Sequence, residues 1–157
     1  MARGRQLVRR GTGFTYVAML TALAIFGIGL AAVGESWSRV SQREREQELL
    51  LVGVEYARAI ERYYQHSPDS IKRYPLQLTD LLDDTRFIGT TRYLRRSYRD
   101  PITNRTAWGL VRDARGGIMG IYSKSERATL MRQLVRLPGT ATLLGERYCD
   151  WKFVYRP

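Results

Sequence analysis

The chain has 157 residues, with 26 Lys and Arg against 15 Asp and Glu, a formal net charge of +11. This length fits one small domain with one modest core, so no second domain is required. A single cysteine, Cys149, excludes an intramolecular disulfide. The sequence shows no recognisable Ser-His-Asp set around its one histidine, His66, and no His/Cys metal cluster. We therefore expect a protein that is not an enzyme and has no cofactor and no metal site.

The chain begins with a basic leader at residues 1–13, MARGRQLVRRGTG, and continues with an uncharged apolar run at residues 14–33, FTYVAMLTALAIFGIGLAAV. At 1.5 Å per residue this run is about 30 Å long, the thickness of a bilayer's hydrocarbon core. It predicts a transmembrane helix over residues 14–34. Four arginines lie in the leader and all acids lie from Glu35 onward. The positive-inside rule therefore predicts a cytoplasmic leader and an external C-terminal domain.

The leader ends in a candidate processing junction. A secretory signal peptide is cut after its apolar run, beside small residues. Here Gly13, Phe14 and Thr15 precede the run, so a cut after Gly13 would remove the charges and keep the apolar helix. The arrangement resembles the processing site of type IV pilin-like proteins, including the pseudopilins of type II secretion systems. The resemblance implies a prepilin peptidase that cuts between Gly13 and Phe14 and methylates Phe14.

The fifth position after this junction departs from the family pattern. Most members carry a glutamate there, which neutralises the amino terminus of a neighbouring subunit, whereas this chain has Ala18. An unpaired carboxylate in lipid is costly, so its absence favours insertion but removes the usual contact between subunits. The departure argues against a bulk filament role more than against the family.

Residues 35–66 predict a periplasmic continuation of the helix. The first part, SQREREQE, is polar, and we interpret it as an exposed helix face. The helix is expected to end near Gln65, because Pro68 disfavours helix in the residue before it. Further along, apolar residues recur at spacings of three and four and predict one buried stripe, made of Leu50, Val54, Ala57, Ile60 and Tyr64.

Residues 67–157 predict a small globular domain. The segments YPLQLTDLLDD and RYLRRSYRDPITNRTAWGLV resemble family stretches in which leucines form a short helical turn and a tyrosine-bearing strand leads into an Asp100-Pro101 turn. Strands are expected at residues 107–112 and 118–123, joined by a glycine-bearing turn, and a short helix at residues 126–137.

A last strand is expected at residues 148–155. Its alternation places aromatic residues on one face, which we expect to pack on the helix stripe; that face carries Cys149, Trp151, Phe153 and Tyr155. The predicted fold class is α+β and pilin-like, with a long N-terminal helix, first transmembrane and then amphipathic, packed on a small antiparallel β-sheet.

A calcium site is also considered, because major pseudopilins bind calcium in a C-terminal loop. Calcium takes six to eight oxygen ligands, and the nearby candidates are limited to Asp100, Asn104 and Asp113. We expect no calcium site.

Arginine and tyrosine residues alternate in the segment RYLRRSYR. The mixture fits phosphate contacts and base stacking, as in a minor pilin of a type IV pilus or a DNA-uptake system. Alternatively, the arginines form a solvated face and the tyrosines point inward, and we favour this second interpretation. The residues concerned are Arg92, Tyr93, Arg95, Arg96, Tyr98 and Arg99.

The resemblance implies a structural subunit of a type II secretion pseudopilus, which takes part in protein export across the outer membrane. The implied partners are the prepilin peptidase, other pseudopilins and the inner-membrane assembly platform, with no nucleic acid among them. The implied location is the inner membrane, as a single-pass protein with a cytoplasmic N-terminus and a periplasmic C-terminal domain, and a periplasmic filament after assembly.

Overall fold

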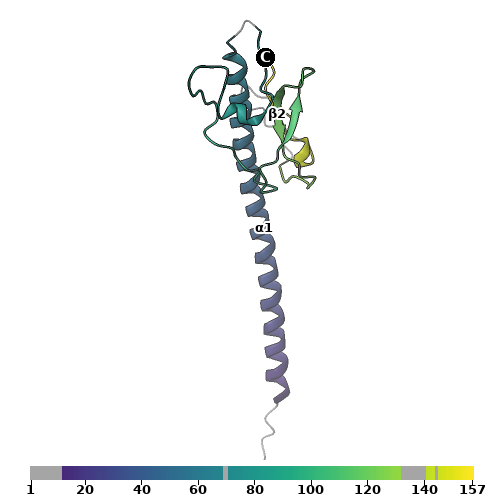
Figure 1. Ribbon diagram of the computed structural model, residues 1–157. Helices are drawn as coiled ribbons and strands as arrows, with labels where there is room; N and C mark the ends of the chain where they lie inside the picture. The colour runs from purple at the N-terminus through teal and green to yellow at the C-terminus, as the bar shows by residue number, and fades with distance from the viewer. Residues whose placement is uncertain (1–11, 69–70, 132–140, 144) are drawn as a thin grey trace, which may run out of the picture. The chain divides into compact units, whose positions relative to one another are not determined.

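The computed structural model describes residues 12–68, 71–131, 141–143 and 145–157 (Figure 1). The fold class is α+β, as the sequence predicted. Contacts divide the chain into two compact units, Met1–Ser41 and Gln42–Pro157. The described elements are, in chain order, α1 (Thr12–Gln65), the 3-10 helix η1 (Leu78–Leu81), β1 (Gly109–Arg112), β2 (Ile118–Tyr122), β3 (Ala141–Leu143), the 3-10 helix η2 (Tyr148–Asp150) and β4 (Lys152–Val154).

In the first unit, the described side chains of residues 14–28 are exposed and belong to α1. Alanine, leucine and methionine are strong helix formers, which suits this run to a helix. Within the part of the chain that the structure describes, however, no helix is both long and apolar enough to cross a membrane. The predicted location, a single-pass inner-membrane protein with a periplasmic domain, is therefore wrong.

In the second unit, α1 buries one face against the globular part of the chain. The predicted stripe is shifted, since Leu50, Val54 and Tyr64 are only half-buried. The predicted stripe does not include the residues at the centre of the contact between α1 and the globular part. The spacing was ambiguous because this helix has apolar residues on more than one side. The buried helix residues are Glu46, Leu49, Val52, Gly53, Tyr56, Ala57, Ala59, Ile60 and Tyr63.

The sheet is antiparallel and has the strand order β1-β2-β4-β3 among the described strands. The β1–β2 hairpin confirms the predicted strand pair and its glycine-bearing turn, where Asp113 Oδ1 accepts hydrogen bonds from the amides of Arg115 and Gly117. β4 runs between β2 and β3, with Phe153 opposite Ile121 on one side and Thr142 on the other.

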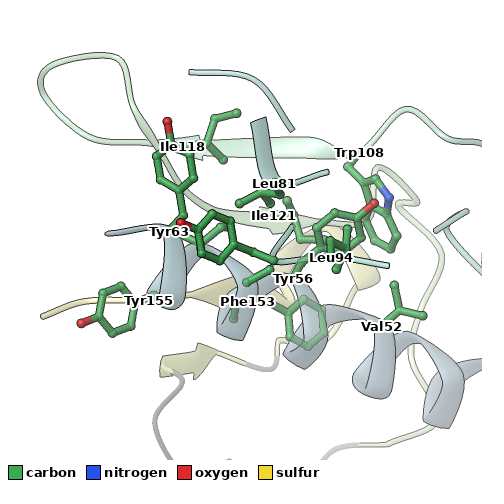
Figure 2. Close-up of a cluster of buried hydrophobic side chains, with 14 of the residues drawn as sticks. Val52, Tyr56, Tyr63, Leu81, Leu94, Trp108, Ile118, Ile121, Phe153 and Tyr155 are labelled. Atoms are coloured by element: carbon green, nitrogen blue, oxygen red, sulfur yellow. The ribbon is translucent and has the colours of Figure 1, made fainter. Parts of the chain in front are cut away.

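The core lies between the helix and the sheet of the second unit. Figure 2 shows Tyr56 and Tyr63 of α1, Ile121 of β2 and Phe153 of β4 among the clustered side chains. The Phe153 ring lies directly against Gly53, where it occupies the space that a Cβ atom would need. This contact confirms that the aromatic face of the last strand packs on the helix.

Residues 92–99 do not form the predicted strand. The amides of Tyr93 and Leu94 both donate to the carbonyl of Leu81 in η1, and the amide of Tyr98 donates to the Tyr56 hydroxyl. These three amides therefore bond to the 3-10 helix and to a side chain instead of to a neighbouring strand. The Asp100-Pro101 turn that follows it is present.

The predicted strand at residues 148–155 begins later than expected. Its first part is the 3-10 helix η2, which is favoured because the Asp150 carboxylate accepts a hydrogen bond from the Arg147 amide at 3.2 Å. Cys149 is therefore half-buried in a 3-10 turn rather than a strand. Val154, which lies on the opposite face of β4 from Phe153, is also buried.

The predicted short helix at residues 126–137 is wrong for its described part. Ala128 pairs with Arg147 as an antiparallel bridge, and the Thr129 amide donates to the carbonyl of Glu146 at 3.0 Å. These bonds across the chain replace the local bonds of a helix. Residues 132–137 lie outside the described residues.

Candidate functional site

The predicted processing junction, Gly13 and Phe14, lies in the first turn of α1, which begins at Thr12. The Phe14 side chain is 82% exposed. The first amides of a helix lack carbonyl partners within the helix, so this end opens more easily than the middle. The junction is thus at an accessible and readily unwound position, and cleavage and methylation stay predictions.

Large apolar side chains are exposed along the helix that follows the junction. We call residues 14–28 the apolar segment. They contain no charged residue, and their exposed side chains occur on all sides of the helix rather than on one stripe. A helix that is apolar all round is normally covered by other apolar groups. The exposed large residues are Phe14, Tyr16, Val17, Met19, Leu20, Leu23, Ile25, Phe26 and Ile28.

A buried carboxylate lies farther along α1, in the stretch that we interpreted as a solvated face. Glu46 is completely buried, so that interpretation is wrong at this position. Its Oε1 accepts hydrogen bonds from the Leu130 amide at 2.6 Å and the Tyr148 hydroxyl at 2.8 Å, and its Oε2 accepts one from the Met131 amide at 3.2 Å. Glu46 precedes the buried Leu49 by three residues, the spacing of neighbours on one helix face. This spacing is the sequence signal that could have identified Glu46 as buried.

The Tyr148 hydroxyl connects this carboxylate to a second helix residue. It accepts a hydrogen bond from Gln42 Nε2 at 2.8 Å while it donates to Glu46. Burial raises the pKa of Tyr148 to about 12, with the Gln42 hydrogen bond acting against the shift and Glu46 adding to it. The phenol therefore stays protonated near neutral pH and acts as a structural donor.

Asp84 and Arg86 form a second polar cluster, beyond the end of α1. Arg86 Nη2 lies 2.7 Å from Asp84 Oδ2, and its Cζ lies 3.6 Å from the centre of the Tyr63 ring. Burial by itself raises the pKa of the Asp84 carboxyl, but hydrogen bonds from Arg86 and from the Tyr93 hydroxyl outweigh it and hold the pKa below its ordinary value. Burial raises the pKa values of Tyr63 and Tyr93.

A cavity of ≈ 860 Å³ lies beside this cluster. The carboxylates around it already have partners. Asp80 accepts from the amides of Leu76 and Gln77, and Asp84 pairs with Arg86. These hydrogen bonds hold the turns together.

In the segment at residues 92–99 the arginines face solvent and the tyrosines point inward, as we predicted. Its arginines are exposed, whereas Tyr93 is buried and Tyr98 is half-buried. The Tyr93 hydroxyl donates to Asp84 at 3.0 Å, so this ring is not available to stack on a base. The four exposed arginines are Arg92, Arg95, Arg96 and Arg99.

The remaining candidates are separated in space or already bonded. Cys149 is a free, half-buried thiol, and His66 Nδ1 lies 2.8 Å from the Arg62 carbonyl at the end of α1. The Asp100 carboxylate accepts three hydrogen bonds, from the Ile102 amide and from two hydroxyls. Within the described ranges, no three His, Cys, Asp or Glu side chains are grouped closely enough to hold a metal ion.

The described part of the chain exposes surfaces that could bind a partner. Two stand out: the exposed apolar segment and the exposed arginines beside the Asp100 turn. Comparison with protein-family models, with curated proteins and with solved structures found no match to this chain.

Proposed function

We propose that the chain is a structural subunit of a pilin-like filament, a type II secretion pseudopilus that takes part in protein export across the outer membrane. The observation that carries this proposal is the exposed apolar segment. The globular unit has a packed core of its own, yet the helix of the first unit leaves Phe14 82% and Phe26 73% exposed. An uncharged helix that is apolar all round requires a partner surface of the same character.

In this proposal, the apolar segments of several subunits bundle together and cover one another. Full burial of one large apolar side chain contributes about 1.5–3 kcal/mol, and nine such side chains are exposed in the segment. The summed contribution of these side chains is comparable with or larger than the cost of association, roughly 4–15 kcal/mol of lost translational and rotational entropy. Ala18, Ala22 and Gly27 are small and let neighbouring helices approach closely.

Removal of the leader is part of the same mechanism. The leader carries four arginines per subunit, and bundling uncut chains would bring these like charges together. A cut after Gly13 removes the charges and keeps the whole apolar segment. Ala18 then adds no carboxylate to the bundle, so subunit register in this chain depends on the fit of apolar side chains.

The processing step is tested by mass spectrometry of the full chain produced together with a prepilin peptidase. We expect a product that begins at a methylated Phe14, and accumulation of uncut chain for the variant Gly13→Val. The matched control is Gly11→Ala, which changes a leader glycine outside the junction and is expected to be cut normally. A product that keeps Met1, or one cut after the apolar run, would contradict the proposal.

The bundling step is tested by disulfide formation between subunits. In a Cys149→Ser background, Phe26→Cys places one thiol in the apolar segment, and Ile88→Cys places one at an exposed position of the globular unit. We expect covalent dimers after mild oxidation for Phe26→Cys and far fewer for Ile88→Cys. Equal yields for the two variants, or monomers only, would contradict assembly through the apolar segment.

A further inference from the structure

Three arginines surround one pocket of the globular unit. The pocket has a volume of ≈ 580 Å³ and lies between α1 and the segment around the Asp100 turn. Arg45 reaches it from α1, and Arg96 and Arg99 reach it from the segment before the turn. The pocket thus combines positive charges from two parts of the chain that are about fifty residues apart in sequence.

The charges of these arginines are not neutralised by the carboxylates nearby. Over the described residues, the ion pairs within 4.0 Å are those of Arg58 with Glu55 and Arg86 with Asp84. Asp100 also lines the pocket, but it is fully buried and its carboxylate accepts three hydrogen bonds within its own turn. The remaining acid of the lining is Glu48, which is exposed.

The pocket wall is held in place before any ligand arrives. Arg96 Cζ lies 5.1 Å from the centre of the Tyr98 ring, a cation–π contact that orients the guanidinium. The backbone of Tyr98 is fixed in turn, because its amide donates to the Tyr56 hydroxyl and its carbonyl accepts from Trp108 Nε1 at 2.9 Å. Ser97 and Asn104 add polar groups to the lining.

We propose that this pocket binds phosphate groups. A guanidinium presents its N–H donors as a planar fork, so three of them lining one pocket favour an acceptor with oxygens on several sides. A tetrahedral phosphate meets this requirement, whereas a planar carboxylate offers two oxygens in one plane. The phosphate belongs to a free anion or to the backbone of a nucleic-acid strand. Base stacking is not part of the site, because Arg96 covers a face of Tyr98 and Tyr93 is buried.

The proposal is tested with the full chain, a labelled oligothymidylate of about 12 nucleotides and inorganic phosphate, by fluorescence anisotropy and calorimetry. For the pocket variant Arg45→Gln/Arg96→Gln/Arg99→Gln, we expect oligothymidylate affinity to fall at least about tenfold near 50 mM salt. The slope of log affinity against log salt should fall by about 0.7, because the three arginines hold one phosphate and each neutralised phosphate on a single strand contributes about 0.7.

The matched control is Arg43→Gln/Arg92→Gln/Arg95→Gln. It removes the same charge from the same helix and the same segment, but from exposed arginines that do not line the pocket. We expect it to weaken binding less than about threefold. Equal losses in the two triple variants would overturn the pocket in favour of general surface charge. Thermal unfolding of both variants checks that the fold is kept.

A variant that increases binding gives a test that misfolding cannot mimic. Glu48→Gln removes the exposed acid of the lining and should raise oligothymidylate affinity about two- to threefold. An unchanged or lower affinity would count against the pocket.

Competition then identifies the source of the phosphate. Displacement of oligothymidylate by millimolar inorganic phosphate, together with calorimetric binding that the pocket variant lacks, supports a site for the free anion. Pocket-dependent binding of the oligonucleotide alone supports a site for a nucleic-acid backbone. Displacement by polyglutamate at equal charge, or binding of neither phosphate probe, would overturn the proposal. These outcomes are independent of leader processing and filament assembly.

Discussion

The Glu46 carboxylate accepts a hydrogen bond from the Tyr148 hydroxyl across 2.8 Å, joining α1 to a residue 102 positions later in the chain. Both residues are buried, and the same carboxylate also holds the amides of Leu130 and Met131. A carboxylate removed from water is tolerated when donors surround it. Here, three donors from two other parts of the chain converge on one helix residue and fix its position.

Truncation of this carboxylate should destabilise the globular unit strongly. Glu46→Ala leaves two amides and one hydroxyl without their acceptor, and we expect a loss of roughly 3 kcal/mol in the free energy of unfolding. Tyr148→Phe removes one of the donors and should cost about 1–2 kcal/mol. Urea unfolding of the full chain measures both. Glu44→Ala, at an exposed position of the same helix, should change stability by less than about 0.5 kcal/mol. A similar effect at the two glutamates would contradict the structural role of Glu46.

The contact between Gly53 and Phe153 gives a second prediction. A Cβ atom at position 53 would overlap the Phe153 ring, so Gly53→Ala should destabilise the fold by about 1–3 kcal/mol, although alanine is the better helix former. Gly27→Ala is the matched control, because it lies in the same helix with no atom within 4 Å of the added Cβ. In the unassembled subunit, where no neighbouring helix contacts Gly27, its effect should be neutral or stabilising by up to about 1 kcal/mol. Thermal unfolding compares the two, and a stabilising Gly53→Ala would contradict the close contact.

The sequence predicted the elements whose signals are local. The glycine-bearing turn at residues 113–117 and the alternation on either side of it identified the β1–β2 hairpin, and Pro68 marked the end of α1 at Gln65. These features depend on the dihedral preferences of a few neighbouring residues. They could therefore be predicted without knowledge of the rest of the fold.

Features set by distant partners could not be predicted in this way. The buried face of α1 is centred on Gly53 because Phe153 packs there, and glycine carries no apolar signal of its own. Glu46 lies in a charged stretch and was therefore interpreted as solvated. Its hydrogen-bond donors, the Leu130 amide and the Tyr148 hydroxyl, are far away in the sequence and give no local signal. The pocket around Arg45 was also missed, since its other arginines lie about fifty residues away, although their exposure was expected.

Trp151 provides a direct measure of the packing of the C-terminal region. Its side chain is fully buried, its Nε1 donates to the Gly145 carbonyl at 3.2 Å, and its ring meets that of Tyr148 edge-on with centroids 5.6 Å apart. Trp151→Ala should therefore cost about 3–5 kcal/mol in the free energy of unfolding. Trp37→Ala removes the same side chain from a position that is 74% exposed, and its cost should be close to zero. Chemical unfolding followed by circular dichroism measures both, and a near-neutral Trp151→Ala would contradict the core.

The Asp84–Arg86 pair predicts how stability depends on pH. The folded state holds the pKa of the Asp84 carboxyl below its ordinary value, so its contribution is present above about pH 4 and is lost as the pH falls toward the folded pKa. Asp84→Asn should cost roughly 2–3 kcal/mol near neutral pH. The difference between wild type and this variant should shrink as the pH falls below about 4 toward the lowered folded pKa, because protonation then removes the same charge from the wild type.

Urea unfolding at several pH values tests this prediction, and the comparison with the variant separates Asp84 from the other carboxyls that titrate in this range. Asp83→Asn is the matched control, since Asp83 is the exposed neighbour of the buried Asp84. We expect its effect on stability to stay below about 0.5 kcal/mol. A difference between wild type and Asp84→Asn that stays constant from pH 7 to pH 2 would show that the charge of Asp84 does not stabilise the fold. The cost of the variant would then come from altered hydrogen bonds to Arg86 and Tyr93.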